Sequence, residues 1–273
     1  MPTLCCPVCA LPLAQEGRAL RCEKGHSFDL ARQGYVNLLL SNRSSAKRHG
    51  DDRLMVEARS AFLEKGYYAC LRQALCELAL AFCPEQVSLL DVGCGEGWYT
   101  AGVKESLEAA GRPCDALGID ISRQALIAAA RRKASLSLAV GSVNALPVAE
   151  GSCDLLLNVF APHDEAEFRR VLRPGGVLLK AVPLPEHLME LKAAVYERPY
   201  ANPEPVFALE GFTLLERREV RAGLHLPCPE DIRALFHMTP YYYKTGREDQ
   251  AKLDKLEELD TTAAFCVFAL RRT

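Results

Sequence analysis

From residue 87 to residue 183, apolar runs of strand length alternate with stretches in which apolar residues recur at helical spacing. The first run is VSLLDVG (87–93), and EGWYTAGVKESLEAAG (96–111) follows it as a helix that ends at a glycine. Such alternation is typical of a parallel sheet whose strands are joined by right-handed helical crossovers, so the sequence predicts an α/β fold. The further expected elements are strands at 114–120, 136–142, 153–162 and 175–183 and helices at 122–134 and 165–172.

The segments on either side of this region continue the pattern. Two helices are expected before it, at 53–66 and 69–83. After it, two strands at 211–220 and 263–273 are expected around a helix near 229–237. The carboxyl-terminal part of the chain therefore adds strands to the same sheet.

The composition of the first 66 residues differs from that of the rest. Residues 1–40 are rich in cysteine and punctuated by Pro and Gly, whereas 41–52 are polar and typical of a linker. We therefore expect a small domain at 1–40, a linker and helix at 41–66, and a large domain at 67–273.

Overall composition adds few constraints. The chain has 273 residues, of which 49% are hydrophobic and 25% charged, as in an ordinary soluble globular protein. No apolar run reaches the ~18 residues that span a bilayer, and the N-terminus lacks the order of a signal peptide. We therefore expect a cytoplasmic location and no membrane partner.

The net charge of −2 is unevenly distributed. The N-terminal head (residues 1–49) holds seven Lys/Arg and three Asp/Glu, which gives +4 and leaves −6 for the remainder. An anionic polymer would therefore meet the head first. A charge of +4 is also that of an ordinary solvated surface, so charge alone does not decide.

Residues of the types that bind metals stand close together near the N-terminus. Two residues separate Cys6 from Cys9, three separate Cys22 from His26, and twelve lie between the pairs. Three thiolates and one imidazole make a closed tetrahedral zinc site, which is structural because it leaves no position for water. The x12 spacing also occurs in DNA-reading fingers, but the third cysteine and the turn-like second pair favour a zinc ribbon. Cys5 is a rival ligand, and four unrelated residues in a cysteine-rich chain are the alternative.

A glycine-rich turn is expected where the first strand of the sheet leads into the first helix after it. Gly93, Gly95 and Gly97 allow a tight turn and a close approach of the backbone to a ligand. Their order, G-x-G-x-G, differs from the dinucleotide fingerprint G-x-G-x-x-G. Asp91 and Glu96 would repel a pyrophosphate, so a ligand with a cationic end suits this turn better. The alternative is a nucleotide-binding α/β domain of another kind.

With three later segments, this turn resembles motif I of class I S-adenosylmethionine-dependent methyltransferases. The segments are LGIDIS (117–122), GSVNALP (141–147) and FRRVLRPGGVLL (168–179). The resemblance implies a Rossmann-like, mostly parallel, seven-stranded sheet, here with a small N-terminal zinc ribbon. It implies that Asp91 lies near the methionine ammonium, and that Asp120 binds the ribose hydroxyls. Adenine contacts are implied for Ile121, Ser142, Val143 and Asn144.

The whole chain is similar to the bacterial 23S ribosomal RNA (guanine-N1)-methyltransferases of the RlmA type. Its markers are the CPVC…CEKGHSFDLARQGYVNLLL stretch, ARSAFLEKGYY, LDVGCGEGWYT, EFRRVLRPGG and HLMELK. The resemblance implies methyl transfer from S-adenosylmethionine to N1 of one guanine in a hairpin loop of 23S rRNA, which the zinc ribbon would help to hold. It also implies cofactor contacts at Tyr68, Gly93, Gly95, Glu96 and His187. Without it, Tyr68 and His187 would be interpreted as core or helix-capping residues.

The segment NVFAPH (158–163) is the one that faces the target base in many methyltransferases. Guanine N1 must lose a proton as the methyl group arrives, and alignment of the reactants supplies most of the rate. Asn158 and His163 are the candidate catalytic residues, with His163 as a general base by hypothesis. The guanine must expose its Watson–Crick edge. Phe160, Tyr67 or Trp98 could stack on it, and each is equally plausible in the core.

Two regions are candidates for contact with the RNA. The basic residues of the head would bind phosphates, which predicts affinity that falls steeply with salt. The tyrosines of YYYKTGRED (241–249) would stack on loop bases. It is equally plausible that this segment is amphipathic and packs against the rest of the protein. A homodimer is plausible because it could clamp a hairpin. The basic candidates are Arg18, Arg21, Lys24, Arg32, Arg43, Lys47 and Arg48.

Two other functions stay open, as do the choice of guanine and any link to antibiotic resistance. One is a small-molecule methyltransferase with a structural zinc ribbon, against which the basic head and the linker argue. The other is a non-catalytic zinc-ribbon RNA-binding protein that senses the cofactor. The intact glycine turn, with Asp91 before it and Asp120 after the second strand, argues against this last function.

Overall fold

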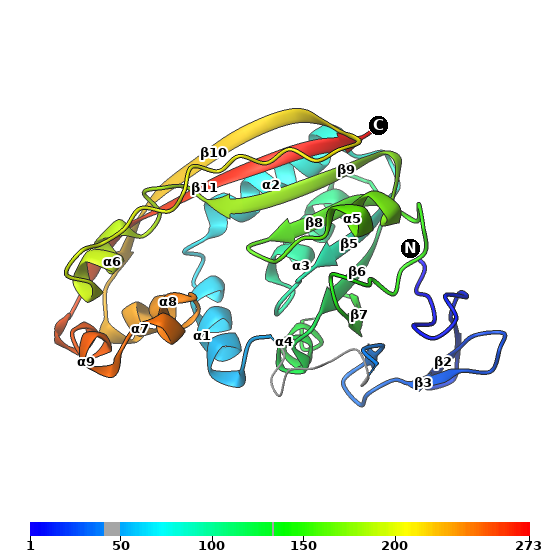
Figure 1. The fold of residues 1–273 in the computed structure, drawn as a ribbon, viewed down its shortest axis with the longest axis horizontal. Coiled ribbons are helices and arrows are strands. Elements are labelled where there is room, and N and C mark those ends of the chain that lie inside the picture. The colour runs from blue at the N-terminus through cyan, green and yellow to red at the C-terminus, as the bar shows by residue number, and fades with distance from the viewer. Residues whose placement is uncertain (41–49, 133) are drawn as a thin grey trace.

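A sheet of eight strands forms the centre of the molecule in the computed structural model, which describes residues 1–40, 50–132 and 134–273. The strands are β4 (Tyr35–Asn37), β5 (Val87–Val92), β6 (Cys114–Asp120), β7 (Ser137–Val140), β8 (Cys153–Val159), β9 (Leu172–Pro183), β10 (Phe212–Leu226) and β11 (Leu259–Arg272). Their order across the sheet is β10-β11-β9-β8-β5-β6-β7-β4. From β9 to β4 all neighbours are parallel, and β11 is antiparallel to both β9 and β10. Figure 1 shows β10 and β11 as two long strands that run side by side at one end of the strand order.

Helices cover both faces of the sheet. On one face, α2 (Ala69–Phe82) and α3 (Trp98–Ala109) bury their apolar sides against the strands. Leu71, Leu75 and Leu78 follow the helical repeat and are fully buried there, which is why this segment of α2 lies flat on the sheet. On the other face, Phe168 of α5 (Glu165–Val171) packs into a second apolar cluster. The sheet is thus the middle layer of an α/β sandwich.

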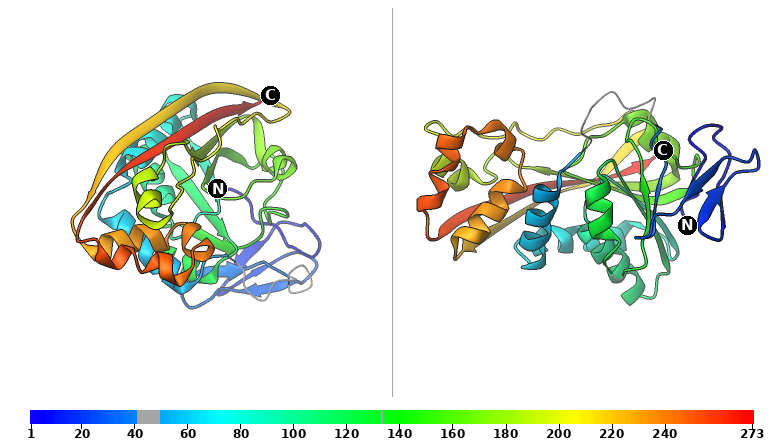
Figure 2. Two further views of the ribbon diagram at one scale, coloured as in Figure 1. Left: turned by 60° about the vertical axis from the view of Figure 1, so that its left-hand side comes forward. Right: turned by 90° about the horizontal axis from the view of Figure 1, so that it is seen from below.

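The remaining α-helices lie in the middle of the molecule and at one of its ends. They are α1 (Arg53–Glu64), α4 (Arg123–Ala129), α6 (Met189–Val195), α7 (Pro229–His237), α8 (Tyr241–Lys244) and α9 (Arg247–Gln250). Figure 2 shows α6 to α9 at one end of the long axis and the N-terminal strands at the other. In the part of the chain that the structure describes, no helix combines the length and apolar character needed to cross a membrane.

The carboxyl ends of the central parallel strands meet at one edge of the sheet. β5 and β8 are buried along most of their length, as expected for parallel strands covered on both faces. Near its carboxyl end each of these strands carries a polar residue, Asp91 in β5 and Asn158 in β8. Because β5 lies between β6 and β8, the chain leaves it at the point where the direction of winding changes, the usual place for a ligand site.

The first 40 residues form a small sheet and then join the large one. β1 (Ala14–Glu16), β2 (Ala19–Arg21) and β3 (Ser27–Asp29) are antiparallel. The N–H of Cys5 donates to the carbonyl of Pro147 at 2.8 Å, and the N–H of Ala149 donates to that of Thr3 at 2.9 Å. β4 then pairs in parallel with β7. The zinc-ribbon region is therefore hydrogen-bonded to the large sheet at several points.

The sheet differs from the sequence prediction in two respects. It has eight strands and not seven, because YVN (35–37) adds an edge strand too short to show a periodic pattern. The last two strands are longer than expected, since β10 continues to Leu226 and β11 already begins at Leu259. The predicted division at residues 40 and 66 stays a prediction, although β4 belongs to the large sheet.

Candidate cofactor site and metal centre

The four predicted metal ligands converge at the tip of the N-terminal region. The thiols of Cys6, Cys9 and Cys22 and the ring of His26 place one ligand atom each within 4.8 Å of all the others. A turn holds the second pair, because the N–H of Gly25 donates to the Cys22 carbonyl, and the N–H of Cys22 donates to that of His26. Cys5, the rival ligand, is directed elsewhere, with its thiol 3.9 Å from the Thr3 carbonyl.

The spacing of these atoms fits a zinc ion. A tetrahedron with Zn–S bonds of about 2.3 Å and a Zn–N bond of about 2.0 Å has S···S edges of roughly 3.8 Å and S···N edges of roughly 3.5 Å. The Cys9 and Cys22 sulfurs are 3.7 Å apart, and the His26 Nδ1 lies 3.5 Å from the Cys6 sulfur and 3.3 Å from the Cys22 sulfur. The predicted zinc ribbon is therefore supported by geometry, with Nδ1 as the ligand atom of His26.

The glycine turn follows β5 as predicted. Gly93, Gly95 and Gly97 all have positive φ, which glycine adopts without strain. The N–H of Gly93 donates to the Ile119 carbonyl at 2.8 Å, so the turn is held against the end of β6. A Cβ on Gly93 would come within 2.4 Å of the Ala161 side chain. The turn therefore needs glycine for its backbone conformation and for its contact with the segment after β8.

Three carboxyl groups surround this turn, and two of them are deeply buried. Asp91 and Glu96 are each only 2% exposed, and burial raises the pKa of both. For Asp91 the pKa rises to about 7, although the Thr100 hydroxyl donates to its Oδ2 at 2.5 Å. The third group, Asp120, also has a pKa raised by burial, while the N–H groups of Gly95 and Ser122 lower it through hydrogen bonds of 2.9 and 2.8 Å.

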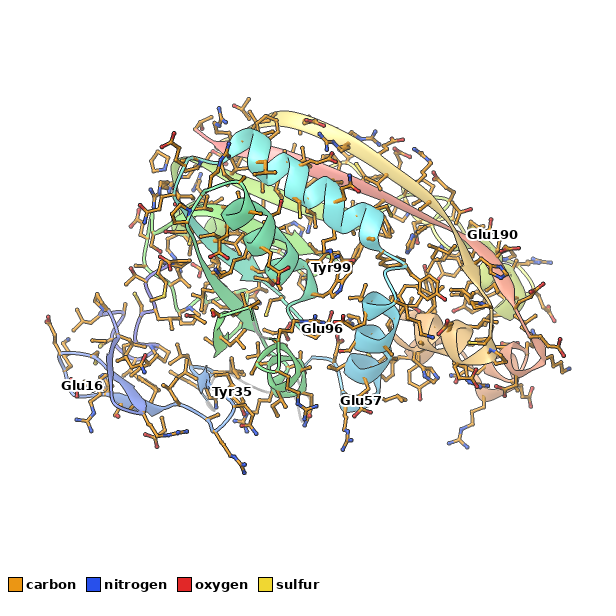
Figure 3. The ribbon with its side chains drawn as sticks, turned by 180° about the vertical axis from the view of Figure 1, so that it is seen from behind. Glu16, Tyr35, Glu57, Glu96, Tyr99 and Glu190 are labelled. Atoms are coloured by element: carbon orange, nitrogen blue, oxygen red, sulfur yellow. The ribbon has the colours of Figure 1, made fainter. Side chains whose placement is uncertain are left out.

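Two of these carboxyl groups have an oxygen without a hydrogen-bond partner. Among the described residues, nothing hydrogen-bonds to Asp91 Oδ1 or Glu96 Oε2, and the Tyr99 hydroxyl is unpartnered as well. Figure 3 labels Glu96 and Tyr99 in the middle of the molecule, and Tyr99 lies in the first turn of α3. Unpaired buried polar atoms are costly, so they indicate that a ligand completes the site. The donor and acceptor set fits S-adenosylmethionine, which carries an ammonium, a sulfonium and two ribose hydroxyls.

One charged residue of the site was missed by the sequence analysis. Arg59 of α1 reaches the turn, with Nη2 2.5 Å from Asp51 Oδ2 and Nη1 3.8 Å from Glu96 Oε2. In the sequence it stands on an ordinary amphipathic helix, where a charged residue usually faces solvent. No periodicity marks it; only its place in ARSAFLEKGYY could have drawn attention to it.

Tyr68 and His187, far apart in sequence, meet beside the apolar cluster of α2 and α3. Both are buried, and the Tyr68 hydroxyl lies 3.5 Å from His187 Nε2. The N–H of Ala264 donates to His187 Nδ1 at 3.1 Å, and burial lowers the pKa of His187 to about 3. The histidine is therefore neutral. Their predicted contact with the cofactor stays a prediction.

The predicted adenosine side adjoins an open pocket of about 800 Å³. Ile121 and Ser122 line it, next to the ribose acid Asp120. Ser142 and Val143 lie just past β7, where Ser142 accepts from the N–H of Asn144 at 3.3 Å. These positions stay predicted adenine contacts. The pocket is lined by Asn37, Leu39, Leu40, Gly50, Asp51, Asp52, Arg53, Leu54, Ile121, Ser122, Arg123, Gln124 and Val140.

The two predicted catalytic residues have different environments. Asn158 is fully buried, and its Nδ2 donates to the carbonyl of Val92 at 3.1 Å and to that of Pro162 at 3.0 Å. It thereby ties the end of β8 to the glycine turn. His163 is exposed, and its ring packs edge-on against Phe207 at 5.2 Å. Their roles stay predictions, and the bonds of Asn158 suit positioning.

Lys180 of β9 is a second residue that sequence reasoning missed. Its Nζ donates to Asn158 Oδ1 at 2.5 Å and lies 3.5 Å from the carbonyl of Ala161. The side chain is buried, which lowers the pKa of Lys180 to about 8. In the sequence it is one charge inside an apolar strand, and the pairing of β8 with β9 brings it beside Asn158.

Of the three aromatic candidates for stacking, Phe160 is the best placed. It follows β8 with φ of +53° and is 44% exposed, and such a backbone strain in a bulky residue often marks a functional position. Trp98 is buried under the guanidinium of Arg72, 4.0 Å from its ring centre. Tyr67 donates its hydroxyl to Asp231 and stacks on Phe62.

Some of the residues predicted to contact RNA are exposed, and others are buried or lie outside the described residues. Arg18, Arg21, Lys24 and Arg32 are exposed on the zinc-ribbon region, whereas Arg43, Lys47 and Arg48 fall outside the described residues. In the second candidate region, Tyr241 is buried and packs in the core. Tyr243 is 58% exposed, and its hydroxyl donates to Asp52 at 2.8 Å.

Comparison with known families matches both halves of the chain. Residues 4–47 match the zinc-ribbon family described as "RlmA, N-terminal", and residues 89–176 match the family "Methyltransferase domain". A solved complex of the Haloferax volcanii Trm112 methyltransferase activator with a methyltransferase has a similar fold. Its TM-score is 0.50 at 16% identity, over 83% of this chain and 99% of that one.

Two bacterial relatives are similar over most of the chain. The 23S rRNA (guanine(748)-N(1))-methyltransferase of Streptomyces fradiae is 45% identical over 70% of this chain and 66% of its own length. YxjB of Bacillus subtilis (strain 168), provisionally named a 23S rRNA (guanine-N(1)-)-methyltransferase, is 32% identical over 94% of this chain and 93% of its own length. With its zinc ribbon and methyltransferase sheet, the chain belongs to the family of bacterial 23S rRNA (guanine-N1)-methyltransferases.

Proposed function

We propose that this protein transfers the methyl group of S-adenosylmethionine to N1 of a guanine in a hairpin loop of 23S rRNA. The observation that carries the proposal is the placement of three groups at one edge of the sheet. The buried acids, each with an oxygen that lacks a hydrogen-bond partner among the described residues, adjoin the glycine turn, and the segment 158–163 packs on that turn through Ala161. Exposed basic residues on the zinc ribbon supply charge for RNA phosphates.

The residues divide into binding and positioning roles. Asp91 and Glu96 would accept hydrogen bonds from the methionine ammonium, and Asp120 would accept them from the ribose hydroxyls. When bound, the cofactor supplies an electrophilic methyl group on a sulfonium. Phe160 would stack on the guanine, since it is the exposed aromatic next to Asn158. Asn158 would hold the segment after β8 against the turn, which fixes the distance between base and cofactor.

The reaction requires a group that accepts the proton of guanine N1. As the N1–C bond forms and the S–C bond breaks, the sulfonium charge disappears and one proton leaves the base. His163 is the acceptor that the sequence predicts. Lys180 is the alternative acceptor that we propose. Burial lowers its pKa to about 8, which leaves a neutral fraction, and the oxygens of Asn158 and Ala161 that face its amine would stabilise the ammonium that forms.

The first experiment is transfer of labelled methyl from S-adenosylmethionine to unmodified 23S rRNA, followed by primer extension. Methylation at N1 blocks base pairing, so a single new stop at a guanine is expected. The Streptomyces fradiae relative is named for guanine 748, and we expect the stop at or beside that position. Label without a stop would mean a different atom or nucleotide. Absence of label in RNA would restore the small-molecule alternative.

Two further features belong to this proposal. A cytoplasmic location follows from the substrate, because ribosomal RNA is assembled there. A homodimer would clamp the hairpin from two sides. Sedimentation of the protein with and without an rRNA hairpin tests the dimer, which a purely monomeric protein in both conditions would exclude.

A further inference from the structure

The α1 helix contributes a cation to a site that is otherwise acidic. Arg59 Nη1 lies 3.4 Å from the position that a Cβ on Gly95 would occupy, so the guanidinium rests against the glycine turn itself. Its side chain is 23% exposed. The charges of Asp51, Glu96 and Asp120 all act on it. Arg59 is therefore a fixed positive charge where the methionine end of the cofactor is expected.

The guanidinium has bonding capacity left on the side of the turn. Nη2 is paired with Asp51 at 2.5 Å, whereas the 3.8 Å from Nη1 to Glu96 Oε2 is the distance of an ion pair without a hydrogen bond. Glu96 Oε2 correspondingly has no hydrogen-bond partner among the described residues. The two groups thus form an ion pair without a hydrogen bond, which leaves the N–H groups of Nη1 able to donate to a ligand at the turn.

A second donor borders the same region. Tyr99 lies in the first turn of α3, at the positive end of the helix dipole, and its buried hydroxyl has no partner among the residues described. Burial raises the pKa of this hydroxyl well above its ordinary value, and Glu96 raises it further while Arg59 lowers it, so the hydroxyl is a neutral donor. An arginine and a hydroxyl at a helix start are the groups that bind a carboxylate.

The chemistry of the ligand links these donors to the acids. In methionine the ammonium and the carboxylate are attached to one carbon, so their binding groups must be neighbours. Asp91 and Glu96 provide the acceptors for the ammonium, and the adjacent donors are Arg59 and Tyr99. We propose that Arg59, with the Tyr99 hydroxyl as a second donor, binds the α-carboxylate of S-adenosylmethionine. This inference rests on the cofactor of the proposed function, and it makes α1 part of the cofactor site.

The test compares two ligands that differ only in this carboxylate. Dissociation constants of S-adenosylmethionine and of decarboxylated S-adenosylmethionine are measured by calorimetry on the full chain, without RNA, for the wild type and for Arg59→Met. We expect Arg59→Met to weaken S-adenosylmethionine roughly 10- to 100-fold and to leave the decarboxylated ligand within about twofold. Tyr99→Phe should shift the same ratio by a smaller factor.

Arg132 offers a matched control. Its Nε donates to the Glu96 carbonyl at 2.6 Å, and its Nη1 pairs with Glu64 at 2.5 Å, so both of these nitrogens are already engaged beside the turn. Arg132→Met should affect both ligands by the same factor. Arg59→Lys keeps the positive charge but lacks the two parallel N–H donors of a guanidinium. Compared with Arg59→Met, it should restore part of the preference for S-adenosylmethionine over the decarboxylated ligand.

Three results would overturn the inference. Equal weakening of both ligands by Arg59→Met would show a structural or purely electrostatic role. An equal shift of the ligand ratio by Arg132→Met would show that any nearby cation suffices. Failure of the wild type to bind either ligand would remove the proposed function as well. A shifted ratio together with no methyl transfer to rRNA would leave Arg59 in place and overturn only the RNA substrate.

Discussion

The chemistry of the Asp91 carboxyl group depends strongly on its surroundings. Burial raises its pKa from 3.8 to about 7, so the protein without ligand keeps this group neutral up to about neutral pH. Its contribution to stability is present below pH 3.8 and is lost as the pH rises through 7. A cationic partner reverses this preference, because it favours the ionised form.

Cofactor binding should therefore release a proton from Asp91. At pH 6 we expect calorimetry in buffers of different ionisation enthalpy to detect this release, and the affinity should rise between pH 6 and pH 8. Asp91→Asn should abolish the release and weaken binding by about tenfold. An unchanged proton count in Asp91→Asn would place the titrating group elsewhere.

The pH dependence of methyl transfer should distinguish the two candidate proton acceptors. Burial lowers the pKa of His163 below 6.5, so a histidine base gives a rate that is flat above about pH 7. A lysine base gives a rate that rises through pH 8, the pKa of Lys180. We expect the second profile under single-turnover conditions from pH 6 to pH 9.

Substitution of each candidate base shows which residue causes the rise in the pH–rate profile. Lys180→Met should slow transfer by about 100-fold or more and remove the rise near pH 8. Lys180→Arg keeps the charge but cannot give up its proton, so it should be equally slow. If the rise persisted in Lys180→Met while His163→Ala removed it, the histidine would be the base.

At the scale of elements, the glycine turn allows a controlled test because another glycine shares its conformation. Gly93 has φ of +78° and would clash with Ala161, whereas Gly111 has φ of +77° with open space around it. Gly111→Ala should cost about 1 kcal/mol of folding stability from backbone strain alone. Gly93→Ala should cost about 1 to 3 kcal/mol more and abolish cofactor binding.

Chemical denaturation and calorimetry on both variants measure these effects. The comparison separates strain in the backbone from the contact between the turn and the segment after β8. Equal losses of stability with unchanged cofactor binding would show that the contact with Ala161 is unimportant.

The elements also show which parts of the fold could be predicted from the sequence. The metal ligands and the glycine turn could be found because each is a local motif with fixed spacing. Arg59 and Lys180 could not, because α1 reaches the turn by packing on α4 and α7, and Lys180 meets Asn158 through pairing of β8 with β9. β4 has three residues, too few for any periodicity.

At the scale of the whole molecule, the metal centre and the cofactor site are separate. The zinc ligands stand beside β1 to β3, whereas the acids and glycines stand on β5, β6 and the turn before α3. Removal of zinc by a chelator should therefore weaken binding of an rRNA hairpin by about tenfold or more. The dissociation constant of the cofactor should stay within about twofold.

Filter binding and calorimetry on the same sample check both expectations. Cys22→Ser, which removes one ligand, should reproduce the effect of the chelator. Equal affinity for the hairpin with and without zinc would mean that the ribbon takes no part in holding RNA.

The pairing of β4 with β7 has a consequence for how a guanine would be chosen. It anchors the zinc ribbon to the edge of the sheet, so the separation between the exposed ribbon cations and the methyl-transfer edge is set by the fold. For the proposed substrate, this fixed separation would select a nucleotide by its distance from the stem that the ribbon binds. The modified nucleotide would be the one whose distance from the bound stem equals the distance from the ribbon cations to the methyl-transfer edge. Lengthening that stem by one base pair should therefore move the modification to a neighbouring nucleotide.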